Sequence, residues 1–517
     1  MCAAALSPRP TRAHSPFATR HRDPPLAIRG LADTGRLDGW SVVDAADDDG
    51  TIEDSAIFFL LLSTEPDQSQ TRARPPDDGT DRSATPSQVT TATLNMAAAT
   101  NGAHIAHIAH AVNVNGAADP LPVLVIGSGS TGLAFAHGLR KAAIRCIVFE
   151  KNPPRTRERD WSMGLHWGAP VLRSLMPDDW WPRIQSVHAD PSEPPQDPDT
   201  LKFVQGDNGN TIAAFPISNF YRLRRSKLRA LLSEHVDIRH EKRLVHVTFA
   251  DDAKSLTAHF SDGTSATGSM LVAADGARST TRRCLLGPDL GAINKIPYCA
   301  TFVESRYAKE QALFLRSFHP LYLATAHPDN YMGFFSTQSA EDPEDPTTWT
   351  FNFYISWPSS LKEQEATAHW TDAQRLAQQK EFAKKFCEPW KSAYEWATED
   401  AGVWYMGMTE WDPGHQGHRW DNHSGLITMV GDAAHPMTYQ RGQGLNHSLM
   451  DAGKLRDTLV KIRDGADRSQ AITSFEDEMI QRAGDEVRSC TTNTALLHDW
   501  EKVKHSPLYS KGMAKNH

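Results

Sequence analysis

A short apolar run followed by three spaced glycines is the feature that most restricts the fold of this 517-residue chain. Val123–Ile126 is a β-branched run of the kind found in buried parallel strands. Gly127 permits a tight turn, Gly129 lets the backbone approach a phosphate, and Gly132 lets the next helix pack closely. Glu150 ends the next predicted strand, where its carboxylate can accept hydrogen bonds from a ribose. The pattern predicts a Rossmann-like unit that binds a dinucleotide.

A second motif follows a predicted buried strand at residues 270–274. The strand runs into Asp275 and Gly276, and Arg278 and Arg282 come shortly after them. An Asp-Gly pair at the end of a strand is also typical of a plain turn with solvated arginines nearby. Both interpretations, a ligand-binding turn and a plain turn, stay open for this segment on residue type alone.

A third motif follows a predicted strand at residues 426–430. The strand ends at Gly431-Asp432, and a glycine-rich helix start follows at 442–446. Gly442 and Gly444 would let this helix start close to a ligand. An ordinary strand–turn–helix crossing is the alternative for this segment alone.

Taken in this order, the three motifs resemble those of the aromatic-ring hydroxylases, which are FAD-dependent monooxygenases built like p-hydroxybenzoate hydroxylase. The resemblance runs from about Leu121 to the C-terminus, and it is to the type found in fungal secondary metabolism. It implies an α/β fold (α+β overall). The parts would be a Rossmann-like FAD-binding domain, an inserted antiparallel-sheet substrate domain and a C-terminal helical segment.

The resemblance also implies domain boundaries and FAD contacts. Residues 119–292 and 422–465 would form the FAD-binding domain, 293–421 the substrate domain, and 466–517 the C-terminal helices. Arg225 is included as a contact because Arg225-Ser226-Lys227-Leu228 matches a family segment whose arginine lies near the flavin. The residues expected to bind FAD are Gly127, Gly129, Gly132, Glu150, Arg225, Asp275, Gly276, Asp432, Gly442, Gly444, Leu445 and Asn446.

The catalytic residues stay open at this stage. His435 lies within the third motif, but a structural hydrogen bond to the backbone is the preferred interpretation of this side chain. Tyr439 stands where family members usually carry a proline beside the flavin. Its hydroxyl would either approach the reacting oxygen or merely fill space. No metal site is expected, because His104, His107 and His110 converge poorly at helical spacing.

The reaction implied by the resemblance uses FAD, O₂ and NADPH (or NADH) as co-substrate. Reduced flavin would form a C4a-hydroperoxide that hydroxylates or epoxidises an aromatic or polyketide-type small molecule. An FAD-dependent reductase of the geranylgeranyl-reductase type is one alternative, and it would not take up oxygen. A non-catalytic flavin-binding redox module is another, and it would bind FAD without consuming NADPH.

Composition limits the partners and the compartment. The net charge of −9 argues against a nucleic-acid partner. The six cysteines are scattered, which is typical of free thiols in a reducing compartment and predicts a cytoplasmic protein. The strongly apolar stretch Ala56–Leu62 is too short to span a bilayer. The expected partners are the substrate, NAD(P)H and O₂, and the protein is expected to be a monomer or a homodimer.

Residues 1–118 differ in composition from the rest of the chain. Residues 72–87 are rich in Arg, Asp, Pro and Thr, and residues 98–118 are rich in Ala, Asn and His. Neither stretch has the period of a buried face, so we predict a disordered, low-complexity extension. Met96 is a candidate for the true start, which would make the upstream part a gene-model extension. A transit peptide is the alternative.

The segment between the second and third motifs carries strand-like runs. They lie at residues 321–325, 331–335 and 349–357. The last run alternates large and small residues with a period of two, which predicts a half-buried strand. Near the C-terminus, Ile472, Phe475, Met479 and Val487 recur at the spacing of an amphipathic helix.

Overall fold

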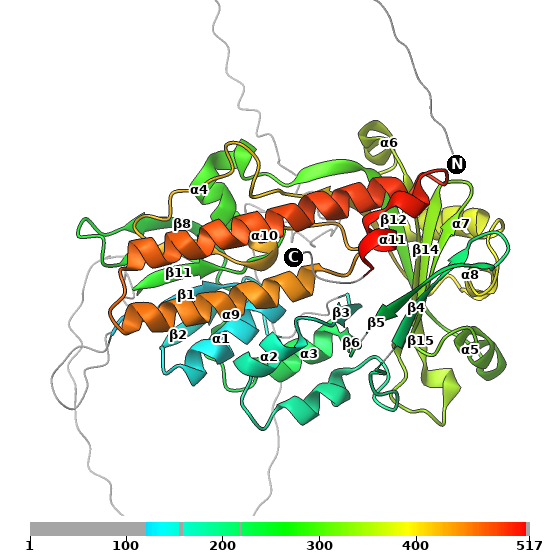
Figure 1. Cartoon of the computed structure of the whole chain (residues 1–517), viewed down its shortest axis with the longest axis horizontal. Helices are drawn as coiled ribbons and strands as arrows, with labels where there is room; N and C mark the ends of the chain where they lie inside the picture. The colour runs from blue at the N-terminus through cyan, green and yellow to red at the C-terminus, as the bar shows by residue number, and fades with distance from the viewer. Residues whose placement is uncertain (1–119, 155–158, 198, 218, 513–517) are drawn as a thin grey trace, which may run out of the picture. The chain divides into compact units, whose positions relative to one another are not determined.

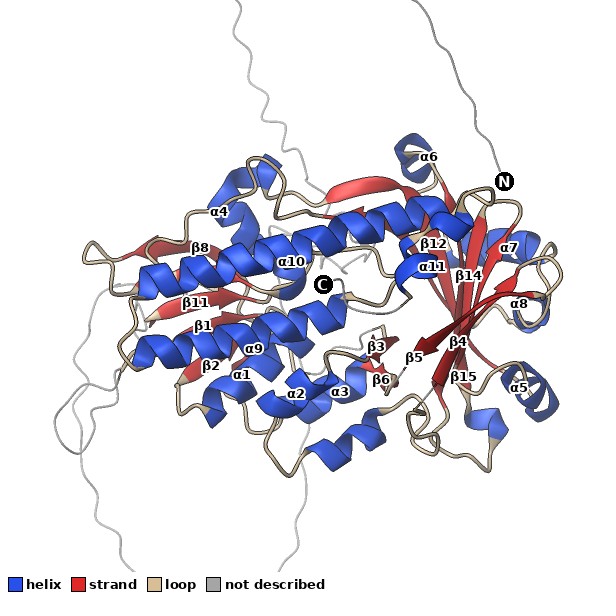
Figure 2. Cartoon of the chain, in the orientation of Figure 1, coloured by secondary structure: helices blue, strands red, loops and turns tan. Residues whose placement is uncertain are grey.

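The computed structural model describes residues 120–154, 159–197, 199–217 and 219–512, all within the compact unit Ala98–His517. Figure 1 labels its elements, and Figure 2 separates helices from strands. The predictions for residues 1–118, including the start at Met96, lie outside the described residues. The α/β fold class is confirmed, with a parallel sheet, antiparallel sheets and a helical C-terminal segment.

A five-stranded parallel sheet forms one half of this unit, in the order β17-β11-β1-β2-β7. Its strands are β1 (Val123–Ile126), β2 (Cys146–Phe149), β7 (Ile238–Arg239), β11 (Met270–Ala273) and β17 (Ile427–Met429). All four residues of β1 are buried, because the sheet is covered on both faces. The three predicted motif strands are therefore neighbours in one sheet.

Helices and a small sheet cover this parallel sheet. The helices near it are α1 (Ser130–Lys141), α2 (Ala169–Leu175), α3 (Arg225–Ser233), α4 (Thr280–Leu290) and α9 (Gly444–Arg463). Helix α1 packs against α2, α3 and α9. The three-stranded antiparallel sheet contains β8 (Leu244–Phe249), β9 (Leu256–Phe260) and β10 (Ser265–Gly268). Its apolar side joins the same core, where the ring of Phe260 stacks on that of Phe149 at 4.7 Å between centroids.

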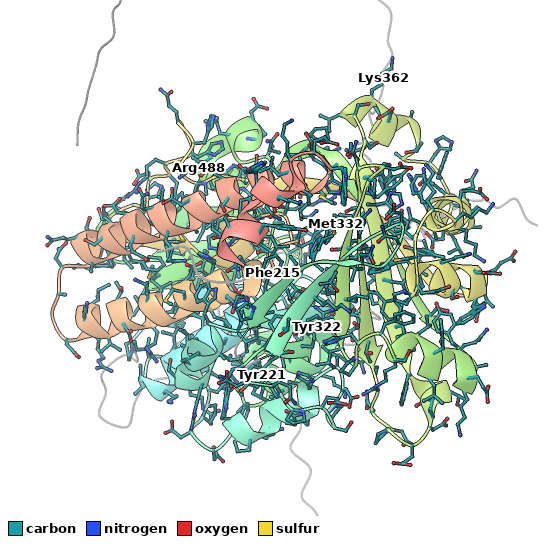
Figure 3. The ribbon with its side chains drawn as sticks, turned by 45° about the vertical axis from the view of Figure 1, so that its right-hand side comes forward. Phe215, Tyr221, Tyr322, Met332, Lys362 and Arg488 are labelled. Carbon is teal, nitrogen blue, oxygen red and sulfur yellow. The ribbon has the colours of Figure 1, made fainter. Side chains whose placement is uncertain are left out.

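A seven-stranded sheet forms the other half, in the order β16-β12-β15-β14-β13-β4-β5. Its strands are β4 (Asp199–Gln205), β5 (Thr211–Ile217), β12 (Asn294–Arg306), β13 (Tyr322–His327), β14 (Tyr331–Ser339), β15 (Thr350–Pro358) and β16 (Gly402–Glu410). Every pair is antiparallel except β13 with β4. In Figure 3, Tyr322 and Met332 lie on adjacent strands of this sheet. Strands β4 and β5 come from the chain before residue 293, so the sheet extends beyond the range expected for a substrate domain.

Strand β15 is buried on both faces, and the prediction of a half-buried strand is wrong. Its residues from Thr350 to Ser356 are all buried. Phe351 and Phe353 pack into a core on one side of the sheet, and Tyr354 packs on the other. The strand lies between β12 and β14, and a hydrophobic core covers each face of the sheet at this strand. Alternate side chains of the strand therefore enter different cores, one on each face of the sheet.

The outer face of the seven-stranded sheet carries further helices. They are α5 (Lys309–Arg316), α6 (Leu361–Ala366), α7 (Asp372–Ala383) and α8 (Trp390–Trp396). Short 3₁₀ turns are η1 (Trp181–Val187), η2 (Pro346–Thr348), η3 (Gly431–Ala433) and η4 (Val503–His505). Trp390 and Tyr394 of α8 are buried against the sheet. In Figure 3, Lys362 marks α6 at the periphery.

A long helix forms near the C-terminus, as the apolar spacing that starts at Ile472 predicts. Helix α10 (Arg468–Leu497) runs beside α9 and reaches the seven-stranded sheet, and α11 (Pro507–Lys511) follows it. A two-stranded antiparallel ribbon, β3 (Ser162–Leu165) with β6 (Tyr221–Arg224), lies in the segment between β2 and α3. Helix α10 contributes to the cores of both halves.

Candidate active site

The three motifs, far apart in the sequence, meet at the carboxyl edge of the parallel sheet. Gly127 has φ = 105°, and a Cβ built on it would lie 2.3 Å from the carbonyl oxygen of Ala274. Arg282, which follows the second motif, donates from Nη1 to the carbonyl oxygen of Ala433 at 3.0 Å. The first motif thus touches the second, and the second is tied to the third. Ligands bind at this edge in open α/β sheets.

The start of α1 forms an open cradle. A Cβ on Gly132 would lie 2.2 Å from the carbonyl oxygen of Gly127, so only glycine lets the helix approach the strand. Around a Cβ built on Gly129, by contrast, no atom lies within 4 Å. Gly129 is the residue before the first turn of α1, where free N–H groups and the helix dipole favour an anion. This open space fits a pyrophosphate.

Glu150 lies at the end of β2 and is turned toward the cradle. Its Oε2 accepts hydrogen bonds from the backbone N of Ser128 at 3.1 Å and from Ser128 Oγ at 2.7 Å. Arg229 Nη2 lies 3.6 Å from the same oxygen. Burial alone would raise the pKa of Glu150, but the bonds from Ser128 and Asn152 and the charge of Arg229 hold it below its usual value. An ionised carboxylate here suits a ribose diol.

The arginines of this region take different places. The guanidinium of Arg225, an expected FAD contact, lies 4.6 Å over the ring of Trp161. Arg229, one helical turn further on, is the arginine beside Glu150 and also donates from Nε to the carbonyl oxygen of Ser128 at 2.8 Å. Arg282 is fully buried and donates to the carbonyl oxygens of Gly291 and Ala277 in addition to Ala433. Arg282 therefore joins backbone segments and is not free to hold a phosphate.

Asp275 presents an acceptor that the protein leaves unused. Its Oδ2 accepts from the backbone N of Thr281 at 3.1 Å. Its Oδ1 is buried and has no hydrogen-bond partner among the described residues. Gly276, with φ = 83°, has no atom within 4 Å of a built Cβ. An orphaned acceptor beside open space fits a hydroxyl-bearing ligand such as the ribityl chain or ribose of FAD.

Asp432 lies in the turn that follows β17. Its carboxylate is accessible to solvent but has protein on several sides. The side chain is exposed, yet burial in the neighbouring structure raises its pKa. Both observations fit a carboxylate that lines a deep cleft. The nearest atom to a Cβ built on Gly444, at the start of α9, is Asp432 Oδ1 at 4.0 Å. Gly442 has φ = 61°, and Leu445 packs partly buried on the core of the parallel sheet.

Asn446 fastens the start of α9 to the β3–α2 segment. Its Oδ1 accepts from the backbone N of His166 and of Gly168, both at 3.0 Å. Its Nδ2 donates to the carbonyl oxygens of Gly164 and Gly442, at 3.2 and 3.1 Å. The side chain is fully buried, and all of its hydrogen-bonding capacity serves backbone groups. In this structure Asn446 positions the β3–α2 segment against the start of α9 rather than presenting a polar atom to a ligand.

The two weak catalytic candidates lie in different surroundings. His435 is fully buried, and its Nε2 lies 2.5 Å from Asp451 Oδ2. Its hydrogen bond therefore goes to a carboxylate, where the sequence suggested a backbone partner. Tyr439 lies against the seven-stranded sheet, with its ring 5.3 Å from Tyr354 and 5.5 Å from Phe302. The hydroxyl of Tyr439 is buried without a partner among the described residues.

An aromatic face of the seven-stranded sheet surrounds Tyr439. The ring of Phe302 stacks on that of Trp404 at 5.1 Å and lies 4.7 Å from that of Tyr354. The ring of Phe334 lies 5.9 Å from that of Tyr354. The rings of Phe302, Phe334, Trp404 and Tyr439 are only partly buried. This face therefore offers aromatic surface next to the segment that leads into α9.

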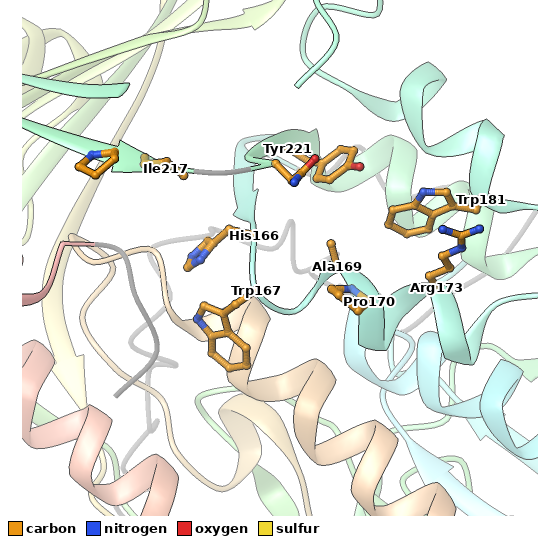
Figure 4. Close-up of a pocket in the computed structure, with 10 residues that line it drawn as sticks. His166, Trp167, Ala169, Pro170, Arg173, Trp181, Ile217 and Tyr221 are labelled. Carbon is orange, nitrogen blue, oxygen red and sulfur yellow. The ribbon is translucent and has the colours of Figure 1, made fainter. Parts of the chain in front are cut away.

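A cavity of about 560 Å³ lies beside the start of α2. Figure 4 shows it between His166 and Trp167 on one side and Arg173, Trp181 and Tyr221 on the other. Trp167 Nε1 donates to Gln443 Oε1 at 2.9 Å, which joins one wall to the residue before α9. The volume of this cavity is within the range of small-molecule binding sites.

Sequence reasoning missed the polar network beneath the third motif. Asp451 accepts from the backbone N of Gly431 and from Arg482 Nη2, at 2.8 and 2.7 Å. Arg441 donates to Glu486, and both side chains are fully buried. Burial alone would raise the pKa of Asp451, but His435 and Arg482 hold it well below its usual value. Asp451, Arg482 and Glu486 lie on α9 and α10, whose apolar spacing predicts only that one face is buried. Nothing in the neighbouring sequence therefore identified their partners.

Together the cradle, the second glycine-rich helix start and the aromatic sheet define a class of FAD-binding oxidoreductases. Two family models match the chain, one at residues 206–489 and the other at residues 122–202, and each is described as an FAD binding domain. The FAD-dependent monooxygenase phnB of Penicillium herquei is 34% identical over 395 residues, which cover 75% of this chain and 94% of phnB. The FAD-dependent monooxygenase cctM of Talaromyces islandicus is 32% identical over 394 residues, covering 76% and 96%.

Solved structures share the fold at low identity. HpxO of Klebsiella pneumoniae, in complex with FAD and uric acid, matches with a TM-score of 0.58 and 19% identity over 76% of this chain and 92% of HpxO. The 2,6-dihydroxypyridine-3-hydroxylase of Arthrobacter nicotinovorans matches with a TM-score of 0.58 and 16% identity, over 74% and 94%. The chain belongs to the FAD-dependent monooxygenases, and the predicted enzyme class and FAD cofactor are confirmed.

Among the residues that the structure describes, no helix has the length and apolar character needed to cross a membrane. No group of three or more His, Cys, Asp or Glu side chains within these ranges is arranged to hold a metal ion.

Proposed function

We propose that this monooxygenase uses NADPH or NADH and O₂ to hydroxylate or epoxidise an aromatic or polyketide-type small molecule. The observation that carries the proposal is the partly exposed aromatic face of Phe302, Phe334, Trp404 and Tyr439 beside the segment that leads into α9. Aromatic rings pack well against such a face in offset or edge-to-face arrangements. A hydroxylase and a urate-bound protein among the solved structures of the same fold are in keeping with this substrate class.

The protein's own groups would bind, orient and shield the reactants. FAD, when bound, supplies the activation of oxygen, which no side chain can perform. In this proposal, Gly129 and the N–H groups of α1 hold the pyrophosphate, Glu150 accepts from the ribose, and Asp275 Oδ1 accepts from a further hydroxyl. Asp432 and the start of α9 at Gly444 would face the middle and the ring of the cofactor. The aromatic face would exclude water from the reacting atoms.

The remaining proposals concern the assembly and the compartment. We propose a monomer or a homodimer whose partners are small molecules. A cytoplasmic location is supported by the five described cysteines, which are all free thiols. In that compartment NAD(P)H would be present to reduce the FAD.

The test begins with the visible spectrum of the purified full-length chain and the identity of the flavin released from it. We expect non-covalent FAD in about one-to-one ratio. Phenols and naphthols are then screened for stimulated consumption of NADPH or NADH and of O₂, with hydrogen peroxide measured as the uncoupled product. Substrate-dependent NADPH use without oxygen uptake would assign a reductase instead. Bound FAD without NADPH use under any substrate would assign a non-catalytic flavin module.

A further inference from the structure

The strand register orders the side chains on the face of the seven-stranded sheet that Tyr439 contacts. Residues directly opposite each other in antiparallel strands point to the same side of a sheet. One continuous row on this face, the aromatic row, consists of Phe334, Tyr354, Phe302 and Trp404. The next row on the same face is polar and consists of Tyr322, Ser336, Asn352 and Glu304. A ring that lies on the aromatic row therefore has polar side chains along one of its edges.

Arg222 lies where these two rows meet. It belongs to β6 of the two-stranded ribbon, and its Nη2 donates to Ser336 Oγ of the polar row at 3.1 Å. Its guanidinium carbon lies 5.2 Å from the ring centroid of Phe334, which is the first residue of the aromatic row. Arg222 therefore places a positive charge beside the face on which the proposed substrate ring would lie.

The guanidinium of Arg222 has more donors than acceptors around it. Arg222 is 8% exposed, and Ser336 Oγ is the hydrogen-bond acceptor that the described part of the chain offers to its five N–H groups. Nε is enclosed without a partner among the described residues. Nη1 has no partner among them either, and unlike Nε it is not enclosed by protein. Nη1 is therefore the donor that a ligand can use without displacing an existing hydrogen bond.

No carboxylate of a described residue balances the charge of Arg222. Burial lowers the pKa of its guanidinium to about 10, and the ionisable side chains that oppose this shift are two tyrosines, so the group stays charged at neutral pH. Other buried arginines differ, since Arg441 pairs with Glu486 and Arg282 donates to three carbonyl oxygens. A buried charge without a counter-ion destabilises a fold unless a ligand supplies the opposite charge.

We propose that Arg222 determines specificity for an acidic substrate, by binding the negatively charged oxygen of a carboxylate or ionised phenol whose ring lies on the aromatic row. The inference rests on the proposed function and adds the charge that the substrate must carry. A charge-assisted hydrogen bond from a guanidinium is stronger than a neutral one and fixes the orientation of the ring on the row. A neutral analogue of the same shape would leave the guanidinium without its anion and bind less well.

The experiment measures binding rather than turnover, with the FAD-loaded full chain and no NADPH. Equilibrium dialysis compares 1-naphthoate with 1-naphthamide, which has the same rings and a neutral substituent of similar shape. A second pair, 4-nitro-1-naphthol (ionised at neutral pH) and its methyl ether, tests the phenol. We expect a preference of about tenfold or more for the anion in one of the pairs, the factor that one charge-assisted hydrogen bond supplies. The pair that shows this preference identifies the acidic group.

Two substitutions separate anion binding from a structural role. Arg222→Met removes the charge at similar length, and we expect the preference to fall below about twofold. Because the charge has no counter-ion among the described residues, this variant should melt at the same temperature as the ligand-free wild type or higher. Arg222→Lys keeps the charge and should retain part of the preference. Arg183→Met is the matched control, since this guanidinium also lies over a ring, that of Trp180 at 4.8 Å, but pairs with Glu234 at the surface.

Four results would overturn the inference. They are a preference below about twofold in both pairs of the wild type, an unchanged preference in Arg222→Met, a lower melting temperature of that variant with equal weakening of anion and neutral analogue, and loss of FAD from it. The last result would assign Arg222 to the cofactor. The proposed function fails separately, if no aromatic compound stimulates oxygen uptake. A kept preference without turnover and a kept turnover without preference are therefore distinguishable.

Discussion

The cradle at the parallel sheet is made mostly of backbone, whereas the opposite wall at the seven-stranded sheet is made of side chains. In the cradle, a Cβ built on Gly127 or on Gly132 would lie 2.3 or 2.2 Å from a main-chain oxygen, so both positions require glycine. At the opposite wall, Phe302, Trp404 and Tyr439 come from three distant segments and meet through their rings. A backbone that only glycine can adopt produces a recognisable glycine pattern in the sequence. A cluster of rings from distant segments produces no such local pattern.

The sharpest way to test this comparison is a pair of glycine substitutions in the cradle. Gly127→Ala places a Cβ 2.3 Å from Ala274 O at a φ of 105°, so we expect a loss of about 3–5 kcal/mol of folding free energy and a largely insoluble protein. Gly129→Ala meets nothing within 4 Å and should fold, but it should lose FAD because the methyl group occupies the open space. Solubility, circular dichroism and flavin content measure both. A well-folded Gly127→Ala protein with FAD would contradict the account.

The next effect concerns the buried ion pair between Arg441 and Glu486, which joins the third motif to α10. Both side chains are fully buried, so Arg441→Met should remove the guanidinium that balances the buried charge of Glu486 and cost about 3–5 kcal/mol. The double variant Arg441→Met with Glu486→Met should recover most of the loss. Urea unfolding followed by circular dichroism gives both values. Equal losses in the single and double variants would show that shape, rather than charge, holds this contact.

A pH-dependent effect is expected on the sheet side, at His498. This residue joins α10 to β15 through Ser356 Oγ at 2.9 Å, and burial lowers its pKa to about 4 from 6.5. Because the unfolded chain takes up the proton first, its contribution is present above pH 6.5 and is lost as the pH falls toward 4, by about 3 kcal/mol. His498→Gln should flatten the stability profile in this window. An unchanged slope from pH 6.5 to 4 would exclude His498 as its source.

A smaller effect is expected for the ribose acceptor. Glu150→Ala removes a carboxylate held by Ser128 and Arg229, and FAD affinity should fall by about 1–3 kcal/mol, or roughly 5- to 150-fold. Fluorescence titration of the apoprotein with FAD measures this change. Glu341→Ala is the control, because this exposed carboxylate pairs with Arg224 and Lys227 away from the cradle. Unchanged FAD retention in Glu150→Ala would remove Glu150 from the site.

The smallest effect on stability belongs to Tyr439→Phe on the sheet side. The hydroxyl has no partner among the described residues, so its removal should change the free energy of unfolding by less than about 1 kcal/mol. If the hydroxyl approaches the substrate, the ratio of hydrogen peroxide to hydroxylated product should rise while FAD content stays the same. If both remain unchanged, Tyr439 only fills space at the proline position. Thermal unfolding and product analysis together decide between these outcomes.

The sequence by itself determined the cradle, the order of its motifs and the FAD-binding oxidoreductase class. Very few residue types can end a strand with a φ of 105°, and only glycine fits where a Cβ on the helix would lie 2.2 Å from a main-chain oxygen, so these positions can be recognised from the local sequence. The sequence predicted the strand that starts at Thr350. Its burial on both faces depends on helices from distant parts of the chain, which the strand's own sequence does not specify.

Only the tertiary structure decided which side chains complete the site. Arg229 rather than Arg225 lies beside Glu150, Arg282 is committed to backbone carbonyls, and His435 is bonded to Asp451. Each of these outcomes depends on which partner the folded chain brings within about 3 Å, and residue type and spacing along the chain do not contain that distance.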